Sequence, residues 1–208
     1  NELKKTFGWT EWFFHNIAVF LFGCTAVLVA PFVSVYTYGI NDANYWQPVF
    51  GAMLAIAHMG QCFRMPYNML ILAAGKYKET QSNYLVATVT NLGLSCLLVP
   101  KLGLIGVTIG TIFALYYQAI WMANYISKNL INWPLKKFWK QVIVDLLVLI
   151  TAGLTSYLID LSASDYYTWF LVSLKVSVLW VIVICTYNGL FYRDNFKQIL
   201  IKMKNKIL

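Results

Sequence analysis

Six long apolar runs constrain the fold of this chain more than any other feature of its 208 residues. Each is long enough to cross about 30 Å of hydrocarbon as a helix, which takes about 20 residues. The chain is 60% hydrophobic and only 12% charged, far from the balance of a soluble domain. We therefore predict an all-α, polytopic membrane protein with about six transmembrane helices, over residues 13–36, 48–75, 83–100, 103–126, 142–160 and 168–191.

The positive charges predict how these helices are oriented. Of the 16 lysines and arginines, 13 lie in alternate segments outside the predicted spans, whereas the segments between those hold one. Cytoplasmic loops carry such an excess, so the N- and C-termini of this segment are predicted to be cytoplasmic. This distribution explains the net charge of +8 through orientation and lipid contact. It argues against nucleic acid as a partner, because a binding domain clusters its charge on one folded face.

Two basic segments are expected to touch membrane lipids. Residues 127–141 combine four lysines with three aromatic side chains, which is typical of a segment that contacts anionic headgroups. Residues 192–208 alternate apolar and basic positions, and they predict an amphipathic cytoplasmic tail helix. The chain begins at Asn1 and shows no signal peptide, so we expect a fragment whose upstream spans are missing. The four cysteines lie inside predicted spans at no metal-ligand spacing, and no motif predicts a metal or cofactor.

One arginine stands within the second apolar run. Arg64 is followed two positions later by Pro66. An arginine at the centre of a bilayer costs about 2.5–3.5 kcal/mol on insertion scales, so Arg64 is expected to face a protein interior or a wet cavity. Pro66 predicts a kink or break beside it, and a charge beside a broken helix at this depth is typical of transporter sites. The alternative is that Arg64 only ties two helices together or snorkels.

Four further polar side chains are candidates for the same cavity. Gln61 and Asn68 lie three residues before and four residues after Arg64, on one helical face. Asn91 and Lys175 are polar positions within the third and sixth runs. The predicted substrate-binding residues are therefore Arg64, Gln61, Asn68, Asn91 and Lys175. For Gln61 and Asn68, hydrogen bonding between helices is an equal alternative.

The remaining charged side chains in or beside the runs are expected near their ends. His15 and Asp145 lie close to the predicted cytoplasmic side, where solvated or capping roles are expected. Lys175 lies about two turns from the outer end of its run, and it has the alternative of reaching outward to Asp160 or Asp165.

The third and fourth runs predict a tight helical hairpin. They are separated only by residues 100–102. Gly106 and Gly110 in the fourth run form a small-xxx-small pair, which lets another helix approach closely.

Several stretches resemble one transporter family. These are RMPYNMLILAAGKYKETQ at residues 64–81, NLGLS at 91–95, GLIGVTIGT at 103–111 and YTYGIND at 36–42. They resemble the polysaccharide-transport flippases of the multidrug/oligosaccharidyl-lipid/polysaccharide superfamily, over about residues 30–126. The resemblance implies a twelve-to-fourteen-span transporter of which this chain is the C-terminal bundle. It also implies export of undecaprenyl-diphosphate-linked oligosaccharide across the bacterial cytoplasmic membrane for capsule, exopolysaccharide or O-antigen, by alternating access. A coupling proton or sodium ion and polysaccharide assembly proteins are the further partners it implies.

Two other functions remain open. A drug or small-molecule exporter of the same superfamily should carry acidic residues at mid-depth, whereas the acids here lie in loops or near predicted span ends. An integral-membrane polymerase or acyltransferase needs positioned acid–base or nucleophilic groups. Neither His15 nor His58 has a carboxylate nearby in sequence. We therefore favour a non-enzymatic flippase with an anionic cargo.

Overall fold

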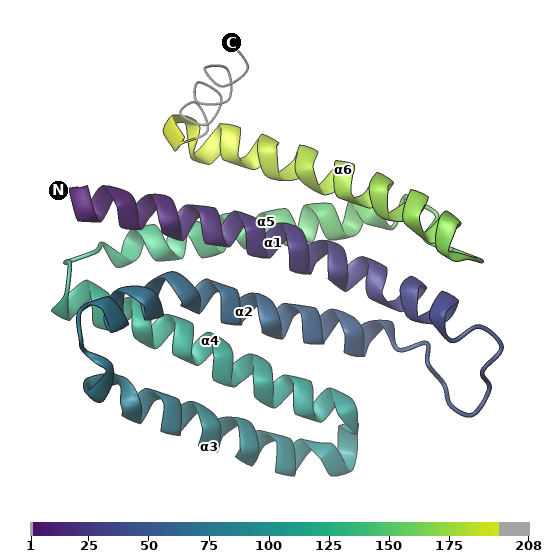
Figure 1. The fold of residues 1–208 in the computed structure, drawn as a ribbon, viewed down its shortest axis with the longest axis horizontal. Helices are drawn as coiled ribbons and strands as arrows, with labels where there is room; N and C mark the ends of the chain where they lie inside the picture. Colours follow the sequence, from purple (N-terminus) through teal and green to yellow (C-terminus); the bar gives the residue numbers. More distant parts are fainter. Residues whose placement is uncertain (1, 196–208) are drawn as a thin grey trace.

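The computed structural model describes residues 2–195, which form a bundle of long α-helices (Figure 1). No strand occurs among these residues, so the predicted all-α fold is confirmed. The helices are α1 (Glu2–Tyr36), α2 (Pro48–Ala73), α3 (Tyr77–Leu102), α4 (Leu104–Asn129), α5 (Leu135–Ser156) and α6 (Tyr166–Phe191).

Five of the six helices are long and apolar enough to cross a membrane, namely α1, α3, α4, α5 and α6. This makes the chain a multi-pass membrane protein by the length and composition of its helices. The exception is α2, which has 26 residues but no stretch that is apolar enough, because His58, Gln61, Arg64 and Asn68 interrupt its apolar residues. It lies between neighbours, with α1 on one side and α4 on the other (Figure 1).

Three helices begin well before the predicted spans. α1 starts at Glu2 rather than near residue 13, α3 at Tyr77 rather than near residue 83, and α5 at Leu135 rather than near residue 142. Asp145 consequently lies in the middle of α5 rather than near its end. Of the predicted kink or break at Pro66, the break does not occur, since α2 continues through this residue as one helix. The predicted tail helix falls largely on residues 196–208, which lie outside the described part of the chain.

The helices pack side by side in a continuous series. α3 packs on α4, α4 on α2 and α2 on α1, while α5 and α6 pack against α1 and each other. The start of α1, the start of α5 and the end of α6 lie at the same end of the bundle (Figure 1). This end gathers segments that are far apart in sequence, and the sequence predicts it to be cytoplasmic.

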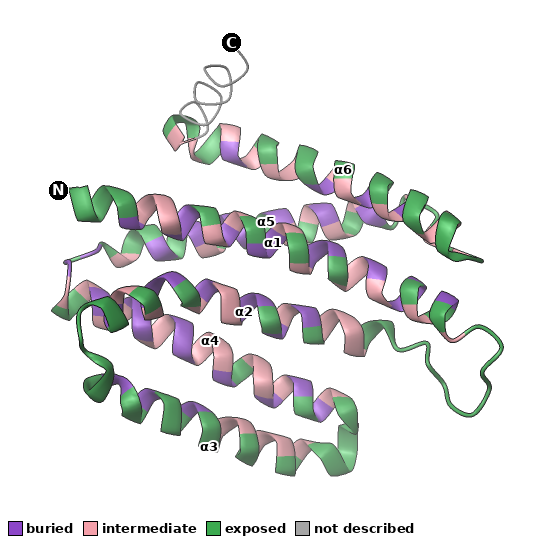
Figure 2. Cartoon of the chain, in the orientation of Figure 1, coloured by how far each residue is buried: buried purple, intermediate pink, exposed green. Residues whose placement is uncertain are grey.

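The outermost helix, α3, has the surface pattern of a lipid-exposed helix. Its only buried residues in the described chain are Thr80, Asn83 and Ala87. Leu85 and Leu97 on the same helix are 66% and 72% exposed. Figure 2 shows α3 at the edge of the bundle with most of its length exposed. A helix that is surrounded by lipid is expected to turn its polar side chains toward the bundle and its leucines outward.

The predicted hairpin between α3 and α4 is confirmed. Gly103 forms the connection with a φ of 55°, which glycine adopts without the penalty of a Cβ atom. A Cβ added at Gly106 would lie 2.7 Å from the backbone carbonyl carbon of Leu98, and one at Gly110 would lie 2.8 Å from the backbone oxygen of Asn91. The two glycines therefore allow the close helix approach that their spacing predicts.

Replacing Gly106 with alanine is expected to separate α4 from α3 and to cost about 1–3 kcal/mol of unfolding free energy, the range for overpacked positions. The clash is with backbone, so no side-chain rotation relieves it. Chemical denaturation in detergent micelles would measure the loss. Gly93→Ala on α3 is the matched control, because a Cβ there meets nothing within 4 Å; equal stability of the two variants would contradict the prediction.

Candidate functional site

Arg64 projects from α2 into a contact with two other helices. Its Nη1 atom donates a hydrogen bond of 2.7 Å to Oε1 of Gln118 on α4, which is buried. Its guanidinium lies 5.4 Å from the ring centroid of Tyr84 on α3, within cation–π range. Its Nε atom is buried and has no hydrogen-bond partner among the described residues. Within the described part of the chain, one donor of this fixed charge is therefore left without a hydrogen-bond partner.

Asn68 joins the same group. Its Oδ1 atom accepts a hydrogen bond of 2.7 Å from the hydroxyl of Tyr84. Tyr84 therefore contacts both Arg64 and Asn68, and α2, α3 and α4 meet at this point. We name Arg64, Asn68, Tyr84 and Gln118 the arginine cluster. Gln61, one turn before Arg64, is half-buried on the same helix.

The two other predicted site residues lie elsewhere. Asn91 sits at the contact of α3 with α4, where its Oδ1 accepts a hydrogen bond from Ser95 at 3.2 Å beside the close approach of Gly110. Lys175 is exposed on α6, which does not pack on α3. Hydrogen bonds from Ser162 lower the pKa of Asp160, and the nearby Lys175 ammonium lowers it further. The structure thus favours helix packing for Asn91 and an outward position for Lys175.

A second polar group, buried in the bundle, was not predicted. His15 is fully buried, and its Nδ1 lies 2.5 Å from Oδ2 of Asp145. The other oxygen of Asp145 accepts a hydrogen bond from Gln141 at 2.9 Å. The expectation that His15 and Asp145 are solvated at helix ends is wrong, because both helices extend further than the apolar runs and bring the two side chains together inside the bundle.

Glu11 is the third ionisable member of this group. One carboxylate oxygen accepts a hydrogen bond from the hydroxyl of Tyr67 on α2, and the other accepts one of 2.9 Å from Nε1 of Trp133. Glu11 and His15 are four residues apart on α1, as are Gln141 and Asp145 on α5, so each pair shares a helical face. That spacing is the signal in the sequence that could have revealed this buried polar group, whose members are Glu11, His15, Tyr67, Gln141 and Asp145. The expectation that His15 has no carboxylate nearby in sequence is therefore wrong, since Glu11 lies one helical turn before it.

His15 and Asp145 have the geometry of an acid–base dyad, but a substrate cannot reach the histidine ring. The His15 ring stacks on Phe63 at a centroid distance of 4.1 Å, and its Nε2 is buried without a hydrogen-bond partner in the described chain. A catalytic histidine needs its second nitrogen within reach of a reacting group. The arrangement supports a structural role in joining α1 to α5.

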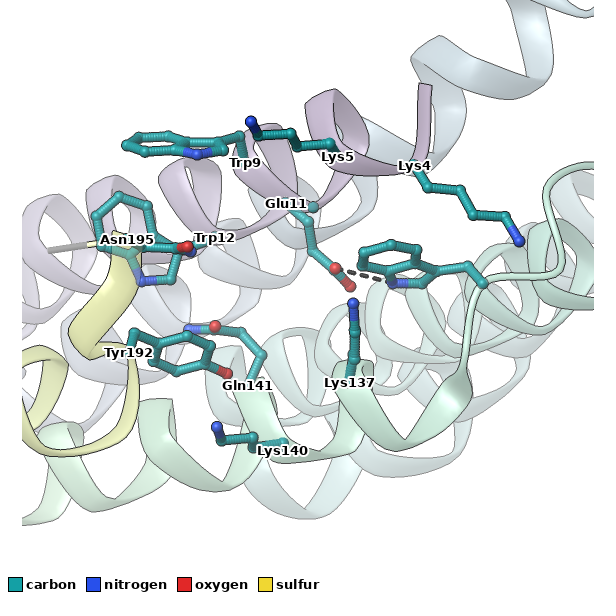
Figure 3. Close-up of a pocket in the computed structure, with 12 residues that line it drawn as sticks. Lys4, Lys5, Trp9, Glu11, Trp12, Lys137, Lys140, Gln141, Tyr192 and Asn195 are labelled. Atoms are coloured by element: carbon teal, nitrogen blue, oxygen red, sulfur yellow. Dashed lines mark hydrogen bonds between the residues drawn. The ribbon is translucent and has the colours of Figure 1, made fainter. Parts of the chain in front are cut away.

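A basic cavity lies beside the buried polar group, at the end of the bundle where α1 begins. Its volume is about 320 Å³. Figure 3 shows Lys137 pointing toward Glu11 from α5, with Lys140 on the same helix and Lys4 extending from the start of α1. We name this cavity the basic pocket; its lining residues are Lys4, Lys5, Gly8, Trp9, Glu11, Trp12, Trp133, Lys137, Lys140, Gln141, Tyr192 and Asn195.

Comparisons with known proteins give no relative. No protein-family model, no curated protein sequence and no solved structure matches the chain. The proposed function therefore rests on the arginine cluster, on the membrane helices and on the sequence resemblance.

Proposed function

We propose that this chain is part of a flippase that exports undecaprenyl-diphosphate-linked oligosaccharide across the bacterial cytoplasmic membrane by alternating access. The observation that carries the proposal is the arginine cluster. A permanently charged side chain is held half-buried where α2 meets the apolar helices α3 and α4, and one of its donors has no hydrogen-bond partner within residues 2–195. Intramembrane charges of this kind mark substrate pathways.

The chemistry of Arg64 suits a diphosphate. A guanidinium presents donors in a planar fork that matches phosphate oxygens bidentately, which an ammonium does not. Tyr84 and Gln118 fix the orientation of the fork, and Asn68 and Gln61 on the same helix provide amide groups for further hydrogen bonds. In this proposal the lipid tail stays in the bilayer while the headgroup passes Arg64.

The arginine cluster also explains why α2 is the one helix of the described chain without a stretch apolar enough to cross a membrane. A helix shielded by α1 and α4 can carry polar groups that lipid-facing helices cannot. The cavities at the two ends of the bundle are lined by other residues, so Arg64 is not part of either. A second helical bundle, supplied by upstream spans, would complete the cavity around it.

The test replaces Arg64 with lysine, glutamine and alanine in the full-length gene. Surface polysaccharide and the inner-leaflet pool of lipid-linked precursor are measured at equal membrane levels of the protein. We expect Arg64→Ala and Arg64→Gln to lower export at least about tenfold, the loss of one charge-assisted contact, with precursor accumulating and partial rescue by lysine. Arg193→Gln, outside α6, is the matched control and should export normally. Normal export in all three Arg64 variants would refute the role of Arg64.

A small-cation exporter is the second candidate, and the buried carboxylates of Glu11 and Asp145 favour it. Their burial overturns the argument that the acids of this chain lie only in loops and near helix ends. Both carboxylates are already paired, however, with His15, Gln141, Tyr67 and Trp133. Cation-dye efflux that is lost in Asp145→Asn but retained in Arg64→Gln would support this candidate over the flippase.

A further inference from the structure

The basic pocket is a second candidate binding site, separate from the arginine cluster. We propose that it binds the phosphate headgroup of an anionic membrane lipid. This inference is independent of the proposed export function, because it uses none of the residues of the arginine cluster and needs no transport.

The charge of the pocket selects an anion. Four ammonium groups line it, from Lys4, Lys5, Lys137 and Lys140, against one carboxylate, that of Glu11. Both oxygens of Glu11 already accept hydrogen bonds, from Tyr67 and Trp133. The four lysines therefore give the pocket an excess of three positive charges over its one carboxylate. That carboxylate already has hydrogen-bond partners within the protein.

Two of the lysines, although exposed, make contacts that hold them in position. Lys140 donates a hydrogen bond of 2.9 Å to the backbone oxygen of Phe191 at the end of α6, and its Nζ lies 4.6 Å from the ring centroid of Tyr192. Lys137 lies 4.2 Å above the ring of Trp133. Such preorganisation lowers the entropy lost when a ligand is bound.

The shape of the pocket depends on a glycine. A Cβ added at Gly8 would lie 2.7 Å from the Trp133 ring, so only glycine lets that indole close against α1. The indole forms a wall of the pocket and carries the cation–π contact with Lys137. A volume of about 320 Å³ lies within the range of small-ligand sites.

The surroundings favour a lipid as the source of the phosphate. Three tryptophans line the pocket, Trp9, Trp12 and Trp133, and tryptophan is enriched at the level of the headgroups. Basic pockets between helices on the cytoplasmic side attract anionic headgroups. Phe13 on α1 and Ile143 on α5, two residues or fewer from pocket residues, are exposed apolar side chains against which acyl chains can lie.

The experiment titrates the purified full chain in a neutral detergent with phosphatidylglycerol or phosphatidylcholine, and measures bound lipid by tryptophan fluorescence and native mass spectrometry. The pocket variant is Lys4→Gln/Lys137→Gln/Lys140→Gln. The control variant, Lys78→Gln/Lys128→Gln/Lys136→Gln, removes the same charge from exposed lysines outside the pocket. We expect the wild-type chain to prefer phosphatidylglycerol, the pocket variant to lose at least about tenfold in affinity and the control to change less than about twofold.

Three outcomes would overturn the proposal. Equal weakening by both triple variants would mean diffuse surface electrostatics, and equal binding of both lipids would remove the charge argument. Binding of inorganic phosphate or pyrophosphate with the same lysine dependence, but no preference for phosphatidylglycerol, would identify a soluble anion instead.

Smaller changes keep the test decisive if the pocket variant does not fold. Lys4→Gln alone should still weaken lipid binding about threefold, and Lys137→Arg/Lys140→Arg should retain binding. Failure of either expectation refutes the site.

Discussion

Replacing Asp145 with alanine is expected to lower the unfolding free energy by about 3–5 kcal/mol, the range for removing one partner of a buried ion pair. The carboxylate is buried and lies 2.5 Å from Nδ1 of His15 while it accepts a hydrogen bond from Gln141. Its loss leaves two buried donors without a partner, in a bundle core where water is not available to replace it. Denaturant titration of the full chain in detergent, followed by circular dichroism, measures the change.

The control for Asp145 is Asp194→Ala, which removes an exposed carboxylate and should leave stability unchanged. A double variant, His15→Phe/Asp145→Leu, separates pairing from packing. Replacing a buried polar pair with apolar side chains of similar size is often neutral, so this variant should recover most of the lost stability. A double variant less stable than Asp145→Ala would mean that the pair is not the stabilising interaction, and so would an Asp145→Ala single variant as stable as the wild type.

The long-range partners of the arginine cluster could not be predicted from the sequence, although its α2 members could. Gln61 and Asn68 share a helical face with Arg64 because of the helix period alone. Tyr84 and Gln118 come from α3 and α4, and their positions opposite Arg64 depend on how far each helix slides along its neighbour. Side-chain packing sets that register, and no periodicity within one segment records it.

The buried polar group was missed for a different reason. An apolar run in the sequence shows which part of a helix lies in lipid, but it does not show at which residue the helix begins. α1 and α5 both start before their apolar runs, so His15 and Asp145 read as end positions, and Glu11 fell outside the first predicted span, although all three lie well inside the helices. Because His15 pairs with Asp145, and Glu11 accepts hydrogen bonds from Tyr67 and Trp133, their burial is possible without the cost of an isolated charge. The hairpin of α3 and α4, in contrast, followed from local signals, since a short break and two glycines four residues apart suffice to define it.

The largest steric effect is expected where α1 crosses α6, at Gly23. A Cβ atom added there would lie 2.0 Å from Cζ3 of the Trp180 ring, so Gly23→Ala is expected to cost about 3 kcal/mol or more. The indole cannot rotate away easily, because it is almost fully buried and its Nε1 donates a hydrogen bond of 3.1 Å to Ser156. Gly153→Ala on α5, where a Cβ meets nothing within 4 Å, is the matched control.

A double variant tests the cause of the clash. The smaller ring in Gly23→Ala/Trp180→Phe should relieve part of it, so the double variant should lose less unfolding free energy than the sum of the two single variants. If Gly23→Ala unfolds at the same denaturant concentration as Gly153→Ala, α1 and α6 do not approach as closely as described, and the packing that brings the end of α6 to the basic pocket would have to be revised.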